Sequence, residues 1–318
     1  MVCGYLEHLF FLFIYYLSVS VGILIAVAFL VVLERKMLGY VQYRKGPNKV
    51  FFMGLFQPFS DAIKLFMKEN IFLMKINKWF YYMSPMLGFF LSLIFLLGFP
   101  LSVNTFSMNL YLFYMMSCMS LNIYVVLLSS WSSNSNYSML GGMRSISQAL
   151  SYEVVMFLIF FVLFFYVESF QLIDFFMYQK NLIFFFMNNI MFFILFIVMI
   201  AELNRMPFDF IEGESELVSG FNVEYMSGSF TLLFLAEYMM ILNMGILFVY
   251  LFYGTFLLSV ISVYFVLIFG SMMIMIRGSF PRLRYDSLMY FCWFNILALV
   301  MMCLLIFFLF KVFLFMNL

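Results

Sequence analysis

The chain has 318 residues, of which 67% are hydrophobic and only 10% are charged, and its mean hydropathy is +1.10. A soluble domain is about 45–50% apolar and about 25% charged. This composition excludes a water-soluble globule, because too little polar surface exists to cover the chain. The net charge of +1 gives no attraction to nucleic acid, and the four cysteines form no Cys-x-x-Cys pair, so no zinc or iron–sulfur site is indicated.

Apolar runs long enough to cross a bilayer recur along the chain, and they do not alternate with polar residues as membrane-barrel strands do. The sequence therefore predicts an all-α fold, a multi-pass transmembrane helix bundle that forms one membrane domain over residues 1–318. The break between the sixth and seventh spans depends on Tyr253 and Gly254 alone. Eight spans are expected, at about residues 9–33, 81–101, 110–131, 149–167, 182–201, 229–252, 254–276 and 288–310.

The basic residues are sorted between the loops that connect these spans. Fourteen of the sixteen fall in the loops after spans one, three, five and seven, whereas only Lys180 and Lys311 fall on the other side. Loops rich in Lys and Arg stay on the inner side of a membrane. We therefore expect the four long loops on the inner side and both termini on the outer side, a pattern that requires an even number of spans.

The first inner loop contains a segment with helical amphipathic spacing at residues 52–68. Phe56, Phe59 and Ile63 lie on its apolar face, while Asp61 and Lys64 lie on the polar face. Such a helix is expected to lie at the membrane interface. It could be a simple anchor, with Asp61 paired to Lys64 one turn away, or it could form the apolar rim of a binding site.

The loop of residues 202–228 is unusually acidic. Six of the fifteen acidic residues of the chain lie in it with one base, Arg205. Acidic residues contribute little to membrane orientation, and apolar residues such as Phe208 and Phe221 interrupt the run. This mixture favours a loop folded into a protein cavity over a solvated acidic loop. The acidic residues are Glu202, Asp209, Glu212, Glu214, Glu216 and Glu224.

Three acids lie within spans or at a span end: Glu153 in the fourth span, Glu202 at the end of the fifth and Glu237 in the sixth. A charge at bilayer depth costs about 2.5–3.5 kcal/mol on insertion scales. No Lys or Arg lies inside these spans, so we expect bound protons or a shared hydrated cavity. The acids then form a proton-conducting or charge-sensing chain, or each is a protonated side chain bonded between helices.

Several motifs, in order and over nearly the whole chain, resemble those of one known family. The runs are residues 33–50, 57–58, 61–66, 68–69, 147–148, 151–154, 212–222, 224–225, 236–238 and 281–286. The family that they resemble is subunit 1 of NADH:ubiquinone oxidoreductase, respiratory complex I. Phe51 departs from the pattern, because Gly is expected there.

The resemblance implies a core membrane subunit of a proton-pumping enzyme that reduces ubiquinone, its substrate, with NADH. NADH, FMN and the iron–sulfur clusters of the family are held by partner subunits, and this chain has no redox centre. The implied partners are the hydrophilic quinone-reducing subunits of the peripheral arm, the antiporter-like and small membrane subunits, and the lipid bilayer. The abundance of Phe and Met is typical of an AT-rich mitochondrial genome, which points to the mitochondrial inner membrane with the basic loops in the matrix and both termini toward the intermembrane space.

The resemblance also implies two sets of site residues on this chain. The first set forms the membrane side of the quinone chamber: Arg35, Arg44, Phe56, Asp61, Arg205, Asp209, Glu212, Glu214 and Phe221. The second set is a buried glutamate relay for protons: Glu153, Glu202, Glu216, Glu224 and Glu237.

Three alternatives stay open. The chain could be the membrane anchor of a related membrane-bound hydrogenase, which would have the acidic relay without quinone. It could be a stand-alone proton or cation transporter, although the sequence has no repeat symmetry. It could also be a purely structural anchor for a peripheral complex.

Overall fold

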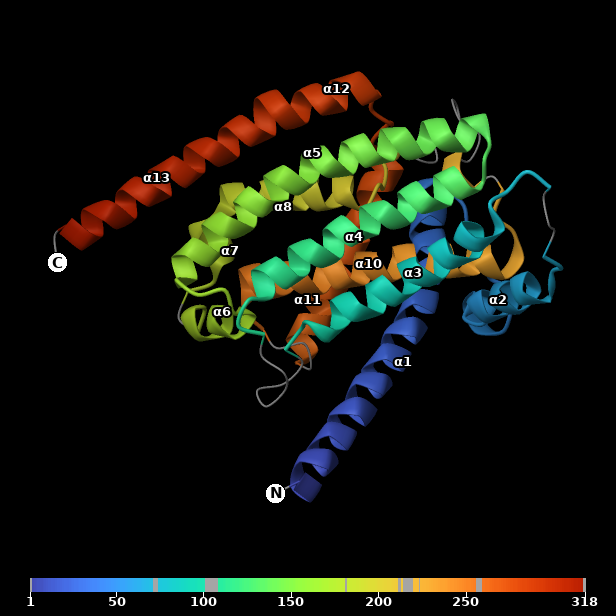
Figure 1. The fold of residues 1–318 in the computed structure, drawn as a ribbon, viewed down its shortest axis with the longest axis horizontal. Helices are drawn as coiled ribbons and strands as arrows, with labels where there is room; N and C mark the ends of the chain where they lie inside the picture. Colours follow the sequence, from blue (N-terminus) through green and yellow to red (C-terminus); the bar gives the residue numbers. More distant parts are fainter. Residues whose placement is uncertain are drawn as a thin grey trace.

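The computed structural model describes residues 2–70, 74–100, 108–180, 182–210, 213, 220–222, 224–255 and 259–316, and within these ranges it describes side chains from residue 13 to residue 313. These residues form helices and no strands (Figure 1). The elements are α1 (Val2–Val41), the 3₁₀ turn η1 (Phe52–Gly54), α2 (Gln57–Met67), α3 (Lys78–Leu97), α4 (Tyr111–Ser132), α5 (Asn136–Val167), α6 (Leu172–Tyr178), α7 (Phe184–Met187), α8 (Asn189–Glu202), η2 (Gly220–Asn222), α10 (Ser227–Tyr253), α11 (Val260–Ser279), α12 (Tyr285–Tyr290), the π-helical turn η3 (Phe291–Ile296) and α13 (Leu297–Met316).

Helix α10 forms the centre of the bundle. Its residues from Tyr238 to Phe252 are all buried, because α3, α11 and α1 pack against it along its length and α6, α7 and α8 pack against parts of it. Helix α5 packs against α4, α8 and α13. In Figure 1 the amino-terminal part of α1 extends below this core, and α13 runs along its upper side and ends at the left.

Seven of the described helical segments are long and apolar enough to cross a membrane, and α8 is a shorter apolar helix of 14 residues. This result confirms the predicted all-α multi-pass membrane bundle. The number of eight spans stays a prediction. The seven segments are Phe13–Val41, Lys78–Leu97, Tyr111–Ser132, Asn136–Val167, Ser227–Tyr253, Val260–Ser279 and Tyr285–Phe313.

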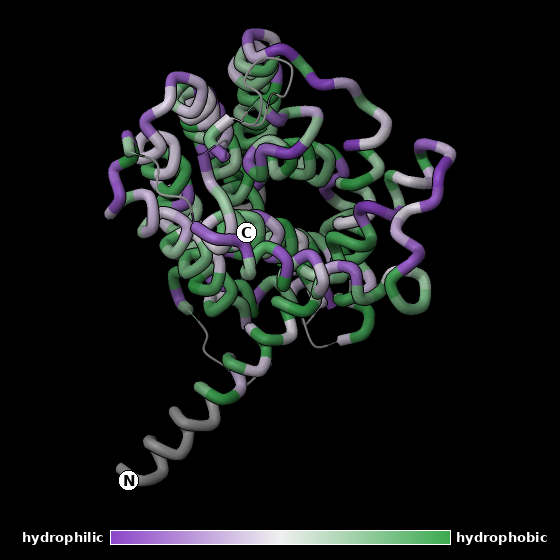
Figure 2. The backbone as a smooth tube through the Cα atoms, turned by 90° about the vertical axis from the view of Figure 1, so that its right-hand side faces the viewer, coloured by the Kyte–Doolittle hydropathy of each residue, from purple (hydrophilic) through white to green (hydrophobic). Residues whose placement is uncertain are grey.

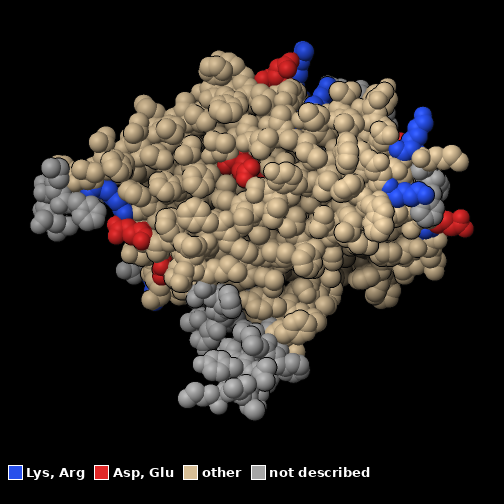
Figure 3. All heavy atoms as spheres, viewed as in Figure 1, with Lys and Arg blue, Asp and Glu red and all other residues tan. Residues whose placement is uncertain are grey.

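Polar and apolar residues are segregated along the bundle, as a membrane requires. Figure 2, seen from the end that carries α2, shows hydrophilic residues mostly in the turns and loops and hydrophobic residues along most of the helices. In Figure 3 the middle of the visible face carries almost no charged side chain, and Lys and Arg gather mainly toward the α2 end. Large apolar side chains such as Phe13 and Phe193 are exposed rather than buried, which is favourable only against lipid.

Two helices differ from the expected spans. Helix α5 begins at Asn136, well before the expected residue 149, so it extends beyond the apolar run. The expected span at residues 182–201 is divided into α7 and α8 by Asn188, whose backbone is not helical. The phenolic hydroxyl of Tyr166 donates to the Asn188 side-chain oxygen at 3.0 Å and provides a local partner at this break.

Helix α10 ends at Tyr253 because Gly254 adopts a left-handed conformation, with φ of +55°. Left-handed glycine is a common helix stop. A Cβ atom at Gly254 would lie only 2.7 Å from the Cβ of Gln179, so packing also favours glycine. The sequence analysis placed a break between two spans at this Tyr–Gly pair.

The expected amphipathic segment, residues 52–68, contains η1 followed by α2. Pro58 lies in the first turn of α2, where its missing N–H is harmless. Phe51, which precedes η1, has φ of +56° and ψ of −158°. This region of backbone conformation is adopted almost only by glycine. Glycine, which the resemblance leads us to expect at this position, would suit this backbone better than the phenylalanine of this chain.

Candidate functional site

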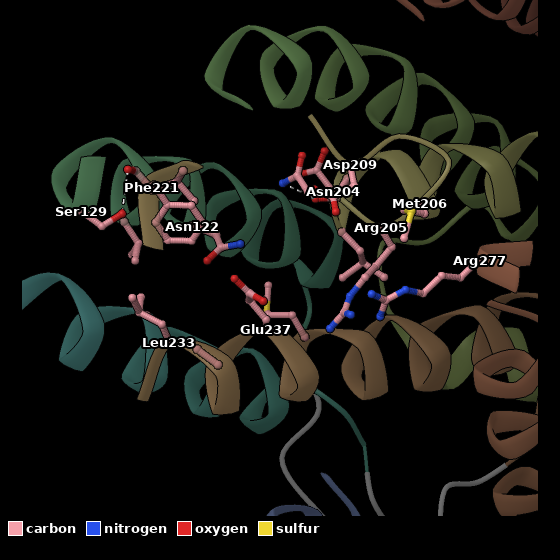
Figure 4. A pocket seen from close by; sticks show the side chains of 17 residues that line it. Asn122, Ser129, Asn204, Arg205, Met206, Asp209, Phe221, Leu233, Glu237 and Arg277 are labelled. Atoms are coloured by element: carbon pink, nitrogen blue, oxygen red, sulfur yellow. Dashed lines mark hydrogen bonds between the residues drawn. The ribbon is translucent and has the colours of Figure 1, made fainter. Parts of the chain in front are cut away.

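A cavity of about 80 Å³, here called the central cavity, lies among α3, α4, α10, α11 and the segment that follows α8 (Figure 4). Its volume is enough for several water molecules, each of which needs about 10–15 Å³ on this scale. In Figure 4, Arg205 and Arg277 lie at one end, Ser129 and Phe221 at the other, and Glu237 between them. The other polar lining residues are Asn122, Glu202, Asn204 and Asp209.

A buried carboxylate on α1, Glu34, joins the arginine end of the cavity to the rest of the bundle. Its side chain is only 8% exposed. Arg277 of α11 forms an ion pair and a hydrogen bond with Glu34 Oε1, Arg205 lies 3.8 Å from the same oxygen, and the hydroxyl of Tyr238 donates to Oε2 at 2.7 Å. These four residues are called the Glu34 cluster below. It connects four segments that are far apart in the sequence.

Arg205 is held by charge and by an aromatic ring. Its guanidinium carbon lies 4.4 Å from the centroid of the Tyr238 ring, in cation–π geometry. Burial lowers the pKa of Arg205, but the electrostatic influence of Tyr238, Glu34 and Glu237 raises it by more, and the net pKa is above the ordinary arginine value. Arg205 therefore keeps its positive charge inside the protein.

The acidic side of the cavity is less well neutralised. Glu202, the last residue of α8, is 8% exposed, and among the described residues its Oε2 has no hydrogen-bond partner. The Glu153 carboxyl on α5 is close enough to interact with it electrostatically. A buried carboxyl without a cation needs a proton or water.

The segment after α8 is fixed by bonds from two other parts of the chain, α5 and the segment between α11 and α12. The Gln148 amide on α5, which is fully buried, donates to the carbonyls of Ala201 at 2.8 Å and Phe208 at 2.9 Å. The N–H of Leu283 donates to the Pro207 carbonyl at 3.1 Å. Arg282 lies 4.0 Å from the buried Asp209 carboxylate. These contacts place Arg205 and Asp209 at the cavity with little freedom.

A second group of predicted residues lies on α1 and α2. Arg35 pairs with Asp61 at 2.6 Å, and the Gln57 amide donates to the other Asp61 oxygen at 2.9 Å. Asp61 thus pairs with α1 rather than with Lys64 on its own helix. Phe56 is half exposed and packs edge-on against Phe51, with ring centroids 4.8 Å apart.

The structure brings some of the predicted site residues together and leaves others apart. Five line the central cavity: Glu202, Arg205, Asp209, Phe221 and Glu237. Glu153 lies beside Glu202. Arg35, Asp61 and Phe56 form the separate α1–α2 group described above. The remaining predicted residues are Arg44, which is exposed and bonded to Gln42, Glu224, whose carbonyl accepts from Tyr81, and Glu212, Glu214 and Glu216, which lie outside the described residues.

Three residues that organise this site, Glu34, Tyr238 and Arg277, were not predicted as site residues. Glu34 and Tyr238 lie inside motifs that supported the resemblance, but neither was assigned to a site. One signal was available for Glu34, because it is an acid at the end of the first span with basic residues directly after it. Arg277 was used only as one of the basic residues that predict the membrane orientation. Its contact with Glu34, 243 residues away, could not be inferred from the sequence spacing.

Together, these features define the class of protein. It is a polytopic helical membrane protein that holds a charged cavity between its helices, with arginines and acids contributed by distant parts of the chain.

Comparison with known proteins assigns the family. A family model described as NADH dehydrogenase matches residues 14–308. A protein of Aedes aegypti named NADH-ubiquinone oxidoreductase chain 1 is 48% identical over 277 residues, which cover 87% of this chain and 88% of its own. Proteins with the same name from Apis mellifera ligustica and Balaenoptera physalus are 45% identical over 298 residues, covering 94% and 97% of the two chains, and 41% identical over 292 residues, covering 90% and 92%.

The chain therefore belongs to the NADH dehydrogenase family, and it acts as a membrane subunit of an NADH:ubiquinone oxidoreductase. The resemblance that the motifs indicated is confirmed. The enzymatic activity is that of the whole complex, in which this chain works with other subunits.

Proposed function

We propose that this chain forms the membrane side of a quinone chamber and that buried carboxyl groups beside it couple quinone reduction to proton translocation. The supporting observation is the direction of two successive side chains on α1. Glu34 binds Arg205 and Arg277 at the central cavity, whereas Arg35 binds Asp61 on α2. One peptide unit thus joins the α2 region, where the quinone headgroup would bind, to the cavity that holds Glu202 and Glu237.

The chemistry of the α1–α2 group suits a quinone. Phe56, Phe59 and Phe66 are exposed on or beside α2, and they offer an apolar rim for an isoprenoid tail. Arg35 would face the polar headgroup, which gains negative character as it takes up electrons. The proposed chamber residues are Arg35, Arg44, Phe56, Asp61, Arg205, Asp209, Glu212, Glu214 and Phe221.

Coupling would begin with a charge change in the chamber. Reduction of a quinone to a quinol consumes two electrons, supplied by iron–sulfur subunits, and two protons. A change in the Arg35–Asp61 pair would alter the field at Glu34, since charges interact strongly where the dielectric constant is low. The Glu34 cluster would transmit this change to Arg205, and the balance between Arg205 and Glu237 would shift. The proposed relay residues are Glu153, Glu202, Glu216, Glu224 and Glu237.

This function also sets the surroundings of the chain. NADH, FMN and the iron–sulfur clusters would be bound by the peripheral arm, and ubiquinone would be the substrate. Antiporter-like and small membrane subunits would adjoin the helices. The basic loops would face the matrix of the mitochondrion and both termini the intermembrane space, in the inner membrane.

The relay is tested by Glu202→Gln in the assembled complex. The substitution keeps the shape of the side chain but removes the exchangeable carboxyl proton, so proton pumping that accompanies NADH oxidation by quinone should fall at least about tenfold, in line with the contribution of a positioned proton-transfer group. The measurement is proton uptake and release by sealed membrane vesicles, normalised to NADH oxidised.

The matched control is Glu168→Gln, because Glu168 is an acid whose side chain is 57% exposed and which pairs with Lys311 away from the cavity. Its pumping should be unchanged. Normal pumping by the Glu202 variant, at normal levels of assembled complex, would remove the relay role.

A further inference from the structure

A buried hydroxyl cluster adjoins the Phe221 end of the central cavity through Ser129, which lines the cavity. Its centre is Tyr225, which lies just before α10 and is 3% exposed. The Tyr225 hydroxyl lies 3.0 Å from Ser84 Oγ on α3, 3.1 Å from Ser132 Oγ on α4 and 3.3 Å from the Ser129 carbonyl oxygen. Ser84 and Ser132 are fully buried. Three hydroxyls thus share one hydrogen-bonded group in the interior.

The cluster lies between two hollows of the protein. On one side, Ser129 and Gly88, each about one helical turn from Ser132 and Ser84, line the central cavity. On the other side, Tyr225 lines an open hollow of about 570 Å³ beside the end of α2, here called the α2 hollow, together with Lys68 and Glu69. The side chain of Tyr225 therefore forms part of the partition between the surface and the buried acids.

The Tyr225 ring is held in a fixed position. It stacks face to face on Tyr81, with ring centroids 4.4 Å apart and planes 3° from parallel. The Tyr81 hydroxyl points elsewhere and donates to the Glu224 carbonyl at 2.7 Å. In the bonds to Ser84 and Ser132 either oxygen can be the donor, so protons can pass along the group in either direction.

Two further observations suit a path for protons. Burial raises the pKa of the Tyr225 hydroxyl, against smaller opposing effects of its bonds with Ser132 and Ser84, so the group stays neutral while it exchanges protons. Asn222, between Phe221 and Tyr225 in the sequence, is 5% exposed, and neither polar atom of its amide has a hydrogen-bond partner among the described residues. Buried amides of this kind are satisfied by ordered water.

We propose that Tyr225 conducts protons from the α2 hollow into the central cavity, where Glu202 and Glu237 receive them. A proton from the hollow bonds to the Tyr225 oxygen as the proton already on that oxygen passes to Ser84 or Ser132. The serine in turn releases its own proton toward a cavity carboxylate. One proton is transferred, no electron moves, and rotation of the hydroxyls restores the starting arrangement.

This inference rests on the proposed relay, since it supplies the protons that the relay would move. It adds an entry point that the resemblance did not indicate. In the proposed orientation the α2 hollow opens toward the matrix, the side from which a proton pump must take its protons.

The test is Tyr225→Phe in the assembled complex. The variant keeps the ring and its stacking on Tyr81 and removes only the exchanging hydroxyl. Quinone-linked proton pumping should fall about tenfold or more, and the solvent deuterium isotope effect on NADH oxidation by quinone should increase. NADH oxidation by an artificial acceptor, reduced directly by the peripheral arm, should be unchanged.

The matched control is Tyr81→Phe, which removes a hydroxyl from the same stacked pair but leaves the cluster intact, so its pumping and isotope effect should be normal. A double variant, Ser84→Ala with Ser132→Ala, leaves Tyr225 in place but removes the next oxygens, and it should lose pumping as Tyr225→Phe does. If Tyr225→Phe fails to assemble, the double serine variant tests the proton entry path in its place.

The outcomes separate the two proposals. Normal pumping by Tyr225→Phe or by the double serine variant, with pumping lost in Glu202→Gln, would overturn the entry path and leave the relay. Normal pumping in all three would overturn both. A loss of pumping in Tyr81→Phe equal to that in Tyr225→Phe would show a packing effect and would also overturn the entry path.

Discussion

A single carboxylate, Glu34, organises the charged interior of this subunit. One of its carboxylate oxygens pairs with Arg277 and Arg205, and the other accepts a hydrogen bond from Tyr238. The side chain is nearly excluded from solvent. Removing one partner of a buried charge pair is costly, because the remaining charge keeps its desolvation penalty without compensation. In this cluster two arginines would be left facing each other, so Glu34 contributes both to stability and to the electrostatic balance of the cavity.

We predict that Glu34→Gln destabilises the subunit by about 3–5 kcal/mol, the usual effect of breaking a buried ion pair. The amide oxygen can still accept the hydrogen bond from Tyr238, so the loss of stability reports the removal of the charge and not of that hydrogen bond. The thermal midpoint of the purified complex, followed by quinone-linked activity after heating, measures it.

The control is Asp286→Asn, because Asp286 pairs with Arg284 at 3.2 Å and both side chains are largely exposed. Such a surface pair contributes about 0–1 kcal/mol, and its loss should barely move the midpoint. Equal midpoints for the two variants would mean that Glu34 is not an essential counter-charge.

At the scale of helices, small residues determine how closely the segments approach. Gly142 on α5 faces Ser130 on α4, and a Cβ atom at Gly142 would lie 2.1 Å from Ser130 Oγ and 2.4 Å from its Cβ. Because Ser130 Cβ is attached directly to the backbone, rotation of the side chain cannot relieve the clash. The α4–α5 contact therefore depends on glycine, and α5 carries the Gln148 amide that holds the cavity segment.

We predict that Gly142→Ala lowers stability by about 1–3 kcal/mol through overpacking, and that it reduces the yield of assembled complex. Gly228→Ala in the first turn of α10 is the control, since nothing lies within 4 Å of the added methyl group. Native gel electrophoresis of membrane extracts measures the assembled fraction. Equal yields of assembled complex for the two variants would show that α4 and α5 can move apart without impairing assembly.

The course of the helices was largely predictable, but not their interruptions. Apolar runs predict helices in a membrane because backbone groups must pair within one segment. The break at Asn188 was not visible, because the residues on both sides are apolar and Tyr166 comes from another helix. At the site, burial of the acids around Glu202 followed from composition, whereas the Glu34 cluster depends on contacts over about 200 residues.

The whole molecule is polarised along its long axis. The segments around α2 carry most of the Lys and Arg, while Lys180 follows α6 and Lys311 lies on α13, two helices that lie away from α2 in Figure 1. Lys311 there bonds to Glu168 and the Phe165 carbonyl and ties α13 to α5. Lys and Arg that stay on one side determine the orientation of a membrane protein. The uneven distribution of Lys and Arg along the helix bundle therefore predicts the same orientation as the loops of the sequence.

We predict that a membrane-impermeant amine reagent modifies Lys180 in intact inner-membrane vesicles with the native orientation and modifies Lys45 and Lys49 only in inverted ones. All three lysines are exposed on the isolated chain. Peptide mass spectrometry of the labelled subunit measures the result. Labelling of Lys45 in vesicles of native orientation would reverse the proposed topology.

The Glu34 cluster also has a consequence for biosynthesis. Its acid is synthesised near the start of the chain, its first arginine, Arg205, after seven further α-helices (α2 to α8), and Arg277 only near the end. A nascent chain must therefore hold Glu34 without Arg277 until the sixth of the seven long apolar segments has left the ribosome. The interior charges can reach their final balance only at the last stage of translation, and a truncated polypeptide would expose an uncompensated carboxylate that quality-control proteases can recognise.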